Sequence, residues 1–118
     1  MSYDDNNIFA KILRGEIPCS KIYENDYVLS FYDVNPQKKI HALIIPKGKY
    51  VDLDDFNTKA SDKEIVGLIK GISIVAKTLG ISVDIGKGYR TLANISEHGG
   101  QEVPHLHFHL FGGEKVGK

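Results

Sequence analysis

The feature that most constrains this chain is a row of histidines that alternate with apolar residues near its C-terminal end. Successive side chains of a strand point to opposite faces, so the alternation predicts a strand over residues 103–111 that Gly112-Gly113 ends. One face would carry the histidines, and the other would pack into the core. The histidines are His105, His107 and His109, and the apolar residues that follow them are Leu106, Phe108 and Leu110.

The spacing of this row indicates that the three histidines have different roles. Neighbours on one strand face lie about 7 Å apart and the outer pair about 13 Å apart, so one phosphate-sized group can touch two of them but hardly all three. His107, in the middle, would contact a substrate atom, while its neighbours orient it or handle protons. An imidazole is mostly neutral at pH 7 and can act as a nucleophile. The weaker interpretation is a row of histidines without a chemical role on a partly solvent-exposed strand face.

Length and charge exclude several classes of protein. The chain has 118 residues, enough for one domain, and its 15 basic and 15 acidic residues cancel. A sequence-independent nucleic-acid binder would carry a basic excess. No apolar run is long enough for a membrane span, and the polar N-terminus is not a signal peptide. The single Cys19 fits a reducing compartment. We therefore expect a cytoplasmic protein with no nucleic-acid or membrane partner.

The pattern along the chain predicts an α+β domain, an antiparallel five-stranded sheet with a short N-terminal helix and one long helix on one side. Asn6 or Asn7 would cap the short helix, which Gly15 ends, and a capping box at Ser61–Glu64 would begin the long helix, which Gly80 ends. The predicted strands cover residues 21–24, 27–33, 40–45, 88–95 and 103–111, with a loop at 47–59 and flexible tails at 1–6 and 114–118.

Four features outside the histidine row have chemistry that suits a nucleotide, three of them with a structural alternative. The carboxylate of Asp33 can accept bonds from ribose hydroxyls or cap the turn that follows it. Phe9 can contact a purine or pack in the core. Asn94 can donate to a phosphate or ribose oxygen. The segment 99–101 can turn backbone N–H groups toward an anion or be a plain hairpin loop. His41, the polar side chain within the predicted strand at 40–45, is on its own the pattern of a satisfied core or edge residue.

The row from His105 to Phe111 resembles the signature of the histidine triad (HIT) family of nucleotide-binding hydrolases and transferases. The resemblance extends from about residue 8 to residue 113. Gly112-Gly113 favours the nucleoside phosphoramidase branch, because dinucleoside polyphosphate hydrolases of the family tend to carry Pro-Arg there. The other similar segments are Ile8-Phe9, Gly15 to Pro18, Phe31 to Pro36, His41 to Lys47, Gly88 to Arg90 and Asn94.

The resemblance implies a homodimer in which two such sheets pair edge to edge, and hydrolysis of the P–N bond of a purine nucleoside phosphoramidate without metal or cofactor. His107 would attack the α-phosphorus while a backbone carbonyl, that of His105, holds its other N–H. The catalytic residues would be His107, His109, His105 and, as a hydrogen-bonding support, His41. The nucleotide-binding residues, for an AMP or GMP derivative, would be Phe9, Asp33, Val34, Asn94, Gly100, Gln101, Glu102, His107 and His109.

Two departures from the family stand out. Glu102 occupies a position that is often serine, and an ionised carboxylate cannot donate a hydrogen bond to a phosphate. We favour a side chain that turns away while its backbone N–H suffices; the alternative is a protonated acid for the leaving amine. The structural zinc site of some bacterial relatives is not expected, because Asn7, Ala10 and Lys49 stand at three of its ligand positions.

Three rival functions remain open. One is a hydrolytic zinc site with His107, His109 and His41 as ligands. Another is a nucleotide-binding regulatory module with little turnover, which keeps Asp33 and Asn94 but makes His107 dispensable. The third is a dinucleoside polyphosphate hydrolase.

Overall fold

Apolar residues on both faces of two central strands determine how this chain is layered. In the computed structural model, which describes residues 2–117, every residue of β3 (Ile40–Pro46) after the first is buried, as are four of the five in β2 (Val28–Tyr32). A sheet of this kind needs cover on both faces. The other elements are α1 (Ile8–Leu13), β1 (Lys21–Glu24), α2 (Leu53–Lys59), α3 (Asp62–Thr78), β4 (Arg90–Leu92) and β5 (Phe108–Gly112).

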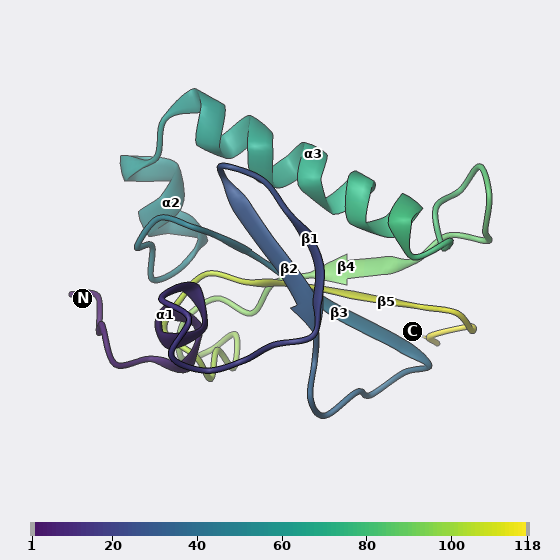
Figure 1. Cartoon of the computed structure of the whole chain (residues 1–118), viewed down its shortest axis with the longest axis horizontal. Helices are drawn as coiled ribbons and strands as arrows, with labels where there is room; N and C mark the ends of the chain where they lie inside the picture. Colours follow the sequence, from purple (N-terminus) through teal and green to yellow (C-terminus); the bar gives the residue numbers. More distant parts are fainter. Residues whose placement is uncertain (1, 118) are drawn as a thin grey trace.

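The five strands form one antiparallel sheet in the order β1-β2-β3-β5-β4 (Figure 1). The prediction of an α+β fold with five antiparallel strands is therefore confirmed. Within the described residues, no helix is long and apolar enough to cross a membrane.

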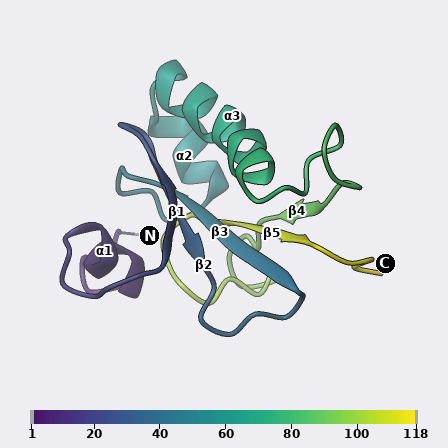
Figure 2. The ribbon, with the colours of Figure 1, turned by 45° about the vertical axis from the view of Figure 1, so that its right-hand side comes forward.

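The prediction that the helices share one side of the sheet is wrong. Val28 and Ile44 pack with α3 on one face, whereas Leu29 and Ile45 pack with Phe9 of α1 on the other. Figure 2 shows α3 and α1 on opposite sides of the sheet. The alternation of apolar side chains in β2 and β3 supplies both clusters.

The long helix begins and ends as its sequence predicts. The side chain of Ser61 accepts a hydrogen bond from the backbone N–H of Glu64, and the Glu64 carboxylate accepts one from the backbone N–H of Ser61. Gly80 follows the helix with φ +73°, a conformation that glycine adopts without strain. Leu68, Ile72 and Val75 line the buried stripe.

We expect Ser61→Ala to lower the free energy of unfolding by about 1 kcal/mol, because it removes the N-cap acceptor. Urea denaturation measures the loss. Ser73→Ala is the matched control: it removes an exposed hydroxyl from the middle of the same helix, where alanine is the better helix former. Equal midpoints for the two variants would contradict a stabilising role for the capping box.

The second helix, α2, was predicted as part of a loop. Asp52 caps it by accepting a hydrogen bond from the backbone N–H of Asp55, and Phe56 anchors it at 1% exposure. The signal was present, since an N-cap aspartate followed by acidic residues in the first turn is typical of a helix start. It was missed because the segment is short and rich in aspartate, with few apolar residues to show a helical period.

The triad strand is shorter than predicted. β5 begins at Phe108, so only His109 of the three histidines lies in a strand. Before it, the N–H of Leu106 donates to the carbonyl of Tyr50 instead of joining the sheet. The two faces are nevertheless kept: Leu106 and Leu110 belong to the α3-side core, while the His107 ring contacts Phe9 on the other face. β4 is also shorter than the predicted 88–95, which leaves Asn94 beyond its end.

Candidate active site

His107 lies immediately before β5 with its ring almost covered, at 6% exposure. Its Nδ1 is 2.7 Å from the carbonyl oxygen of His105. A carbonyl can only accept, so Nδ1 carries the proton and Nε2 is left with its lone pair. No described residue bonds to Nε2, and among the described residues no buried side-chain nitrogen or oxygen lacks a partner. Nε2 of His107 therefore reaches the surface as an unprotonated nitrogen.

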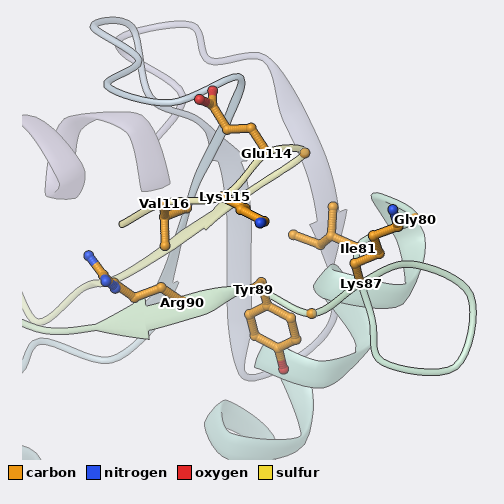
Figure 3. Close-up of a pocket in the computed structure, with 10 residues that line it drawn as sticks. Gly80, Ile81, Lys87, Tyr89, Arg90, Glu114, Lys115 and Val116 are labelled. Atoms are coloured by element: carbon orange, nitrogen blue, oxygen red, sulfur yellow. The ribbon is translucent and has the colours of Figure 1, made fainter. Parts of the chain in front are cut away.

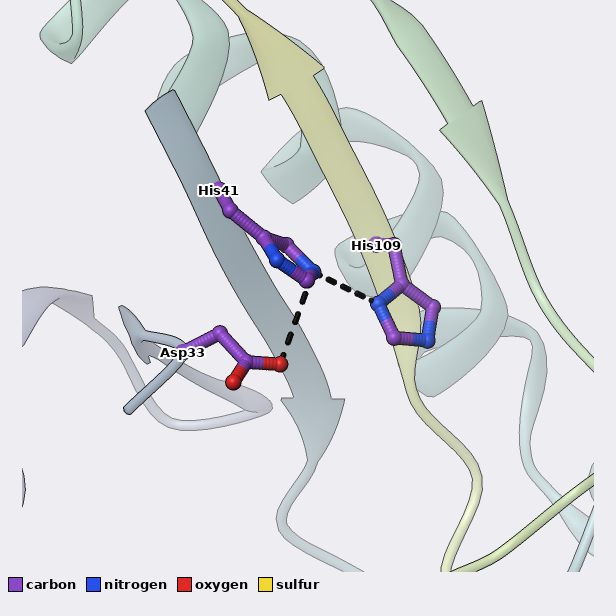
Figure 4. Close-up of side chains that lie close together, drawn as sticks. All are labelled: Asp33, His41 and His109. Atoms are coloured by element: carbon purple, nitrogen blue, oxygen red, sulfur yellow. Dashed lines mark hydrogen bonds and ion pairs between the residues drawn. The ribbon is translucent and has the colours of Figure 1, made fainter. Parts of the chain in front are cut away.

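His109 is oriented by His41 on the neighbouring strand β3. Nδ1 of His41 lies 3.2 Å from the backbone N–H of Gln37, so it accepts, and its Nε2 carries the proton. That N–H donates to Nδ1 of His109 over 2.9 Å. Asp33 points its Oδ2 at the same Nε2 from 3.4 Å (Figure 4). His109 consequently keeps its own proton on Nε2 and presents an N–H donor beside His107, whose ring centroid is 5.2 Å away.

His105 is completely buried, at 0% exposure. Its Nε2 is 2.9 Å from the carbonyl oxygen of Pro46 and must donate to it. Its Nδ1 therefore accepts, and the donor is the hydroxyl of Tyr3 at 2.5 Å. Because no atom of this ring is exposed, His105 can orient His107 but cannot exchange protons with a bound substrate. Its partner Tyr3 carried no signal in the sequence.

Burial lowers the pKa of all four histidines in the cluster. The pKa of His105 falls to about 4, and burial together with the neighbouring His107 and His41 lowers that of His109 to about 4. Burial also lowers the pKa of His107, against smaller opposing effects of the His105 carbonyl, Asp33 and Glu102. For His41 the opposing charge is Asp33. The cluster is therefore neutral at pH 7.

Comparisons with known proteins agree with this geometry. The sequence matches the family described as HIT domain over residues 14–116. It is 51% identical to an uncharacterised 13.2 kDa HIT-like protein of Azospirillum brasilense, over 98% of this chain and 93% of the relative. It is 40% identical to the purine nucleoside phosphoramidase of Escherichia coli K12, over 96% of this chain and 92% of the relative. The chain belongs to the HIT family.

A solved structure gives the same result for the fold. The HIT family hydrolase from Legionella pneumophila superimposes with a TM-score of 0.84 and 36% identity, over 95% of this chain and 96% of that one. The predicted family is therefore confirmed, and this HIT protein is hydrolase-like.

Two of the predicted nucleotide residues of this HIT protein, Asp33 and Phe9, lie against the histidine cluster. Asp33 accepts a hydrogen bond from the backbone N–H of Asn35 through Oδ1, so its turn-capping interpretation holds while Oδ2 faces His41. Val34 is 88% exposed. Phe9 is buried in the core and also lies edge-on to His107, with ring centroids 5.0 Å apart. Asn94 is half-buried.

The segment 99–101 does not present its N–H groups to an anion, contrary to the prediction. The backbone N–H groups of Gly99, Gly100 and Gln101 donate to carbonyls within residues 95–97. These bonds close a compact turn in which the N–H groups are already satisfied. Of the amides expected to face a phosphate, that of Glu102 is left, since no described residue accepts from it.

The side chain of Gln101 fastens this turn to the rest of the site. Its amide nitrogen donates to the carbonyls of Val51 and Val103 over 2.6 and 3.0 Å, and its oxygen accepts from the backbone N–H of Ser96. Gln101 therefore supports the backbone that leads to the triad, and its polar side-chain atoms are already engaged.

A cation could find three ligand atoms in Asp33, His41 and His109, which lie within 4.8 Å of one another. This group does not include His107, so it is not the ligand set of the predicted rival. It also suits a metal poorly. Nδ1 of His41 accepts from Gln37 and its Nε2–H donates to His109, so a metal at Nε2 would require His41 to lose its only ring proton. The expectation that no metal takes part stays a prediction.

A cavity of about 670 Å³ lies away from the histidines, between β4 and the segment after β5. Tyr89 and Arg90 line it on one side and Glu114 and Lys115 on the other (Figure 3). It contains none of the predicted site residues.

Proposed function

We propose that this HIT protein hydrolyses the P–N bond of purine nucleoside phosphoramidates, such as an adenylate joined to an amine. The observation that carries the proposal is the outward Nε2 of a neutral His107, whose Nδ1–H is held by the His105 carbonyl over 2.7 Å. A nitrogen prepared in this way is a nucleophile. The named activity of the Escherichia coli relative supports the choice of substrate.

In the proposed reaction, the lone pair on Nε2 of His107 forms a bond to the α-phosphorus as the P–N bond to the amine breaks. The departing nitrogen takes a proton from water. The hydroxide left from that water then attacks phosphorus, breaks the bond to Nε2 and releases the nucleoside monophosphate together with neutral His107. The Nδ1–H bond to His105 stabilises the positive charge that the ring carries in the intermediate.

His109 and the backbone of Glu102 would stabilise the phosphate. Each offers one N–H that no described residue accepts. A well-aimed donor of this kind can contribute about 3 to 4 kcal/mol to the transition state. Asp33 would hold the ribose through Oδ2, with Phe9 and Val34 at the purine and Asn94 at a phosphate or ribose oxygen, while Gly100 and Gln101 shape the loop.

The test is a panel of adenosine and guanosine phosphoramidates and one dinucleoside polyphosphate, assayed after exhaustive chelation. Turnover of the phosphoramidates, with nucleotide trapped on His107 and identified by mass spectrometry, is the expected result. Faster cleavage of the polyphosphate would favour the hydrolase alternative. Binding without turnover would favour a regulatory module, and loss of activity that zinc restores would favour a metal site.

We expect Glu102→Ser to raise kcat/KM for a simple phosphoramidate several-fold. The exposed carboxylate lies close enough to His107 to influence its pKa and would repel a phosphate, whereas a hydroxyl can donate to it. Glu97→Ser is the control, since it removes an exposed carboxylate from the same loop. An unchanged or lower rate for Glu102→Ser alone would count against this account of the site.

We also propose that the protein is a cytoplasmic homodimer in which two sheets pair edge to edge. β4 supports this, because it is an edge strand of the sheet and, within residues 2–117, pairs with β5 alone. An unpaired strand edge is a ready template for another strand. Light scattering should give twice the chain mass at micromolar concentration. A monomer at every concentration would contradict the proposal.

A further inference from the structure

Tyr3 reaches the triad from the N-terminal segment, 102 residues away along the chain from His105. Its ring lies edge-on to the His105 ring with centroids 5.5 Å apart. The Nε2–H of His105 is committed to the Pro46 carbonyl, so the tyrosine hydroxyl is the donor and Nδ1 the acceptor. Burial raises the pKa of Tyr3, which keeps this hydroxyl protonated at neutral pH.

The segment that carries Tyr3 is fastened at several points. Asp5 forms an ion pair with Lys49 over 2.8 Å, and its carbonyl accepts from the Arg14 guanidinium over 2.8 Å. The side-chain amide of Asn7 donates to the carbonyl of Asp4. Residues 1–6 were predicted to be a flexible tail; Met1 lies outside the described residues, and Tyr3 to Asn6 form these local contacts. The contacts of Asp4 and Asp5, which follow Tyr3 in the chain, therefore help to hold Tyr3 against His105.

The consequence for His107 follows from a chain of three bonds. Tyr3 and Pro46 hold the His105 ring at both nitrogens, and the ring fixes the residue whose carbonyl accepts the Nδ1–H of His107. Without the tyrosine hydroxyl, a completely buried nitrogen would lose its donor, which favours a rotated or retautomerised His105 ring. Either change would move the carbonyl that keeps the lone pair of His107 on Nε2.

We propose that Tyr3 is a positioning residue for His107 and acts through His105. Its kinetic consequence rests on the proposed phosphoramidase function, whereas its structural consequence can be measured on the free protein. Among the described residues, the hydrogen bond of the Tyr3 hydroxyl goes to His105 and not to a predicted nucleotide-binding residue, so we expect its loss to act on the chemical step and to leave substrate binding intact.

The experiment compares Tyr3→Phe with Tyr27→Phe in the full chain. Tyr27 is also half-buried, and no described residue hydrogen-bonds to its hydroxyl. We expect Tyr3→Phe to lower kcat about tenfold with KM unchanged, because small displacements of a reacting group cost rate. In the free protein, long-range proton–nitrogen NMR should show a shifted His105 Nδ1 and a second tautomer of His107. Tyr27→Phe should change neither.

An unchanged kcat together with an unchanged His107 spectrum for Tyr3→Phe would overturn the proposal, as would a rise in KM alone. If the unaltered protein shows no turnover, the proposed function fails while the NMR comparison still decides the role of Tyr3. Asp5→Asn is a second variant for the case in which Tyr3→Phe does not fold. It loosens the segment without touching His105, and the same resonances should move by a smaller amount.

Discussion

Replacing His107 by asparagine is expected to abolish turnover of an adenosine phosphoramidate while the nucleotide still binds. Asparagine can donate to the His105 carbonyl, but it has no nitrogen lone pair that could form a bond to phosphorus. Loss of a covalent nucleophile removes the whole reaction path, so kcat/KM should fall at least about 10⁴-fold. Steady-state kinetics measures the fall, and calorimetry with AMP measures the retained binding.

His98→Asn is the matched control for this prediction. His98 is exposed, in the loop before the triad, and belongs to no hydrogen-bonded group of the site. Its variant should keep the rate of the unaltered protein within about twofold, as expected for a surface substitution. If His107→Asn kept more than about 1% of the rate, the reaction would not pass through this imidazole. A nucleotide label on another histidine would lead to the same conclusion.

The parts of the fold that were predictable depend on neighbours in sequence. The capping box at Ser61 and the turn at Gly80 each depend on residues within a few positions of one another in the sequence. Both are present as predicted. The placement of the histidines on the face opposite Leu106 and Leu110 also followed from alternation alone, although that face is itself covered by Phe9. The alternation holds although His105 and His107 lie outside β5, because the extended chain before a strand keeps the same alternation of side chains.

The parts that were missed depend on residues far apart in sequence. Pairing ends at Phe108 because the chain before it bonds to Tyr50. The partner of His105 is Tyr3, at the opposite end of the chain. The glycines of the loop suggested free N–H groups, but whether an N–H is free is decided by which carbonyls fold back onto it, as those of residues 95–97 do. No local pattern contains this information.

Acidification is expected to destabilise this protein between pH 6.5 and about 4, before most carboxylates titrate. In the unfolded chain His105 takes up a proton near its ordinary pKa of 6.5, whereas in the folded protein its pKa is about 4. Within that window the unfolded state binds more protons, so stability falls as pH falls. The folded ring stays neutral because it is buried between Pro46 and Tyr3. A difference of this size corresponds to roughly 3 kcal/mol.

His109, whose pKa is also lowered to about 4, acts in the same direction. Urea denaturation at several pH values from 7 to 4.5 measures the effect. His98→Gln should reproduce the curve of the unaltered protein, whereas His105→Gln should make its fall with pH shallower, since His109 still contributes. A free energy of unfolding that stays level across this range would contradict a buried neutral His105.

The rate should begin to fall at a lower pH than it would if the nucleophile were an ordinary exposed histidine. Burial lowers the pKa of His107, so the nucleophilic nitrogen stays unprotonated as pH falls through 6.5. We therefore expect kcat/KM for a phosphoramidate to remain level at pH 6.5 and to fall only at more acidic values, in parallel with the loss of stability. A rate that halves at pH 6.5 would indicate a nucleophile in open solvent, which is incompatible with an imidazole covered by Phe9 and held by the backbone of His105.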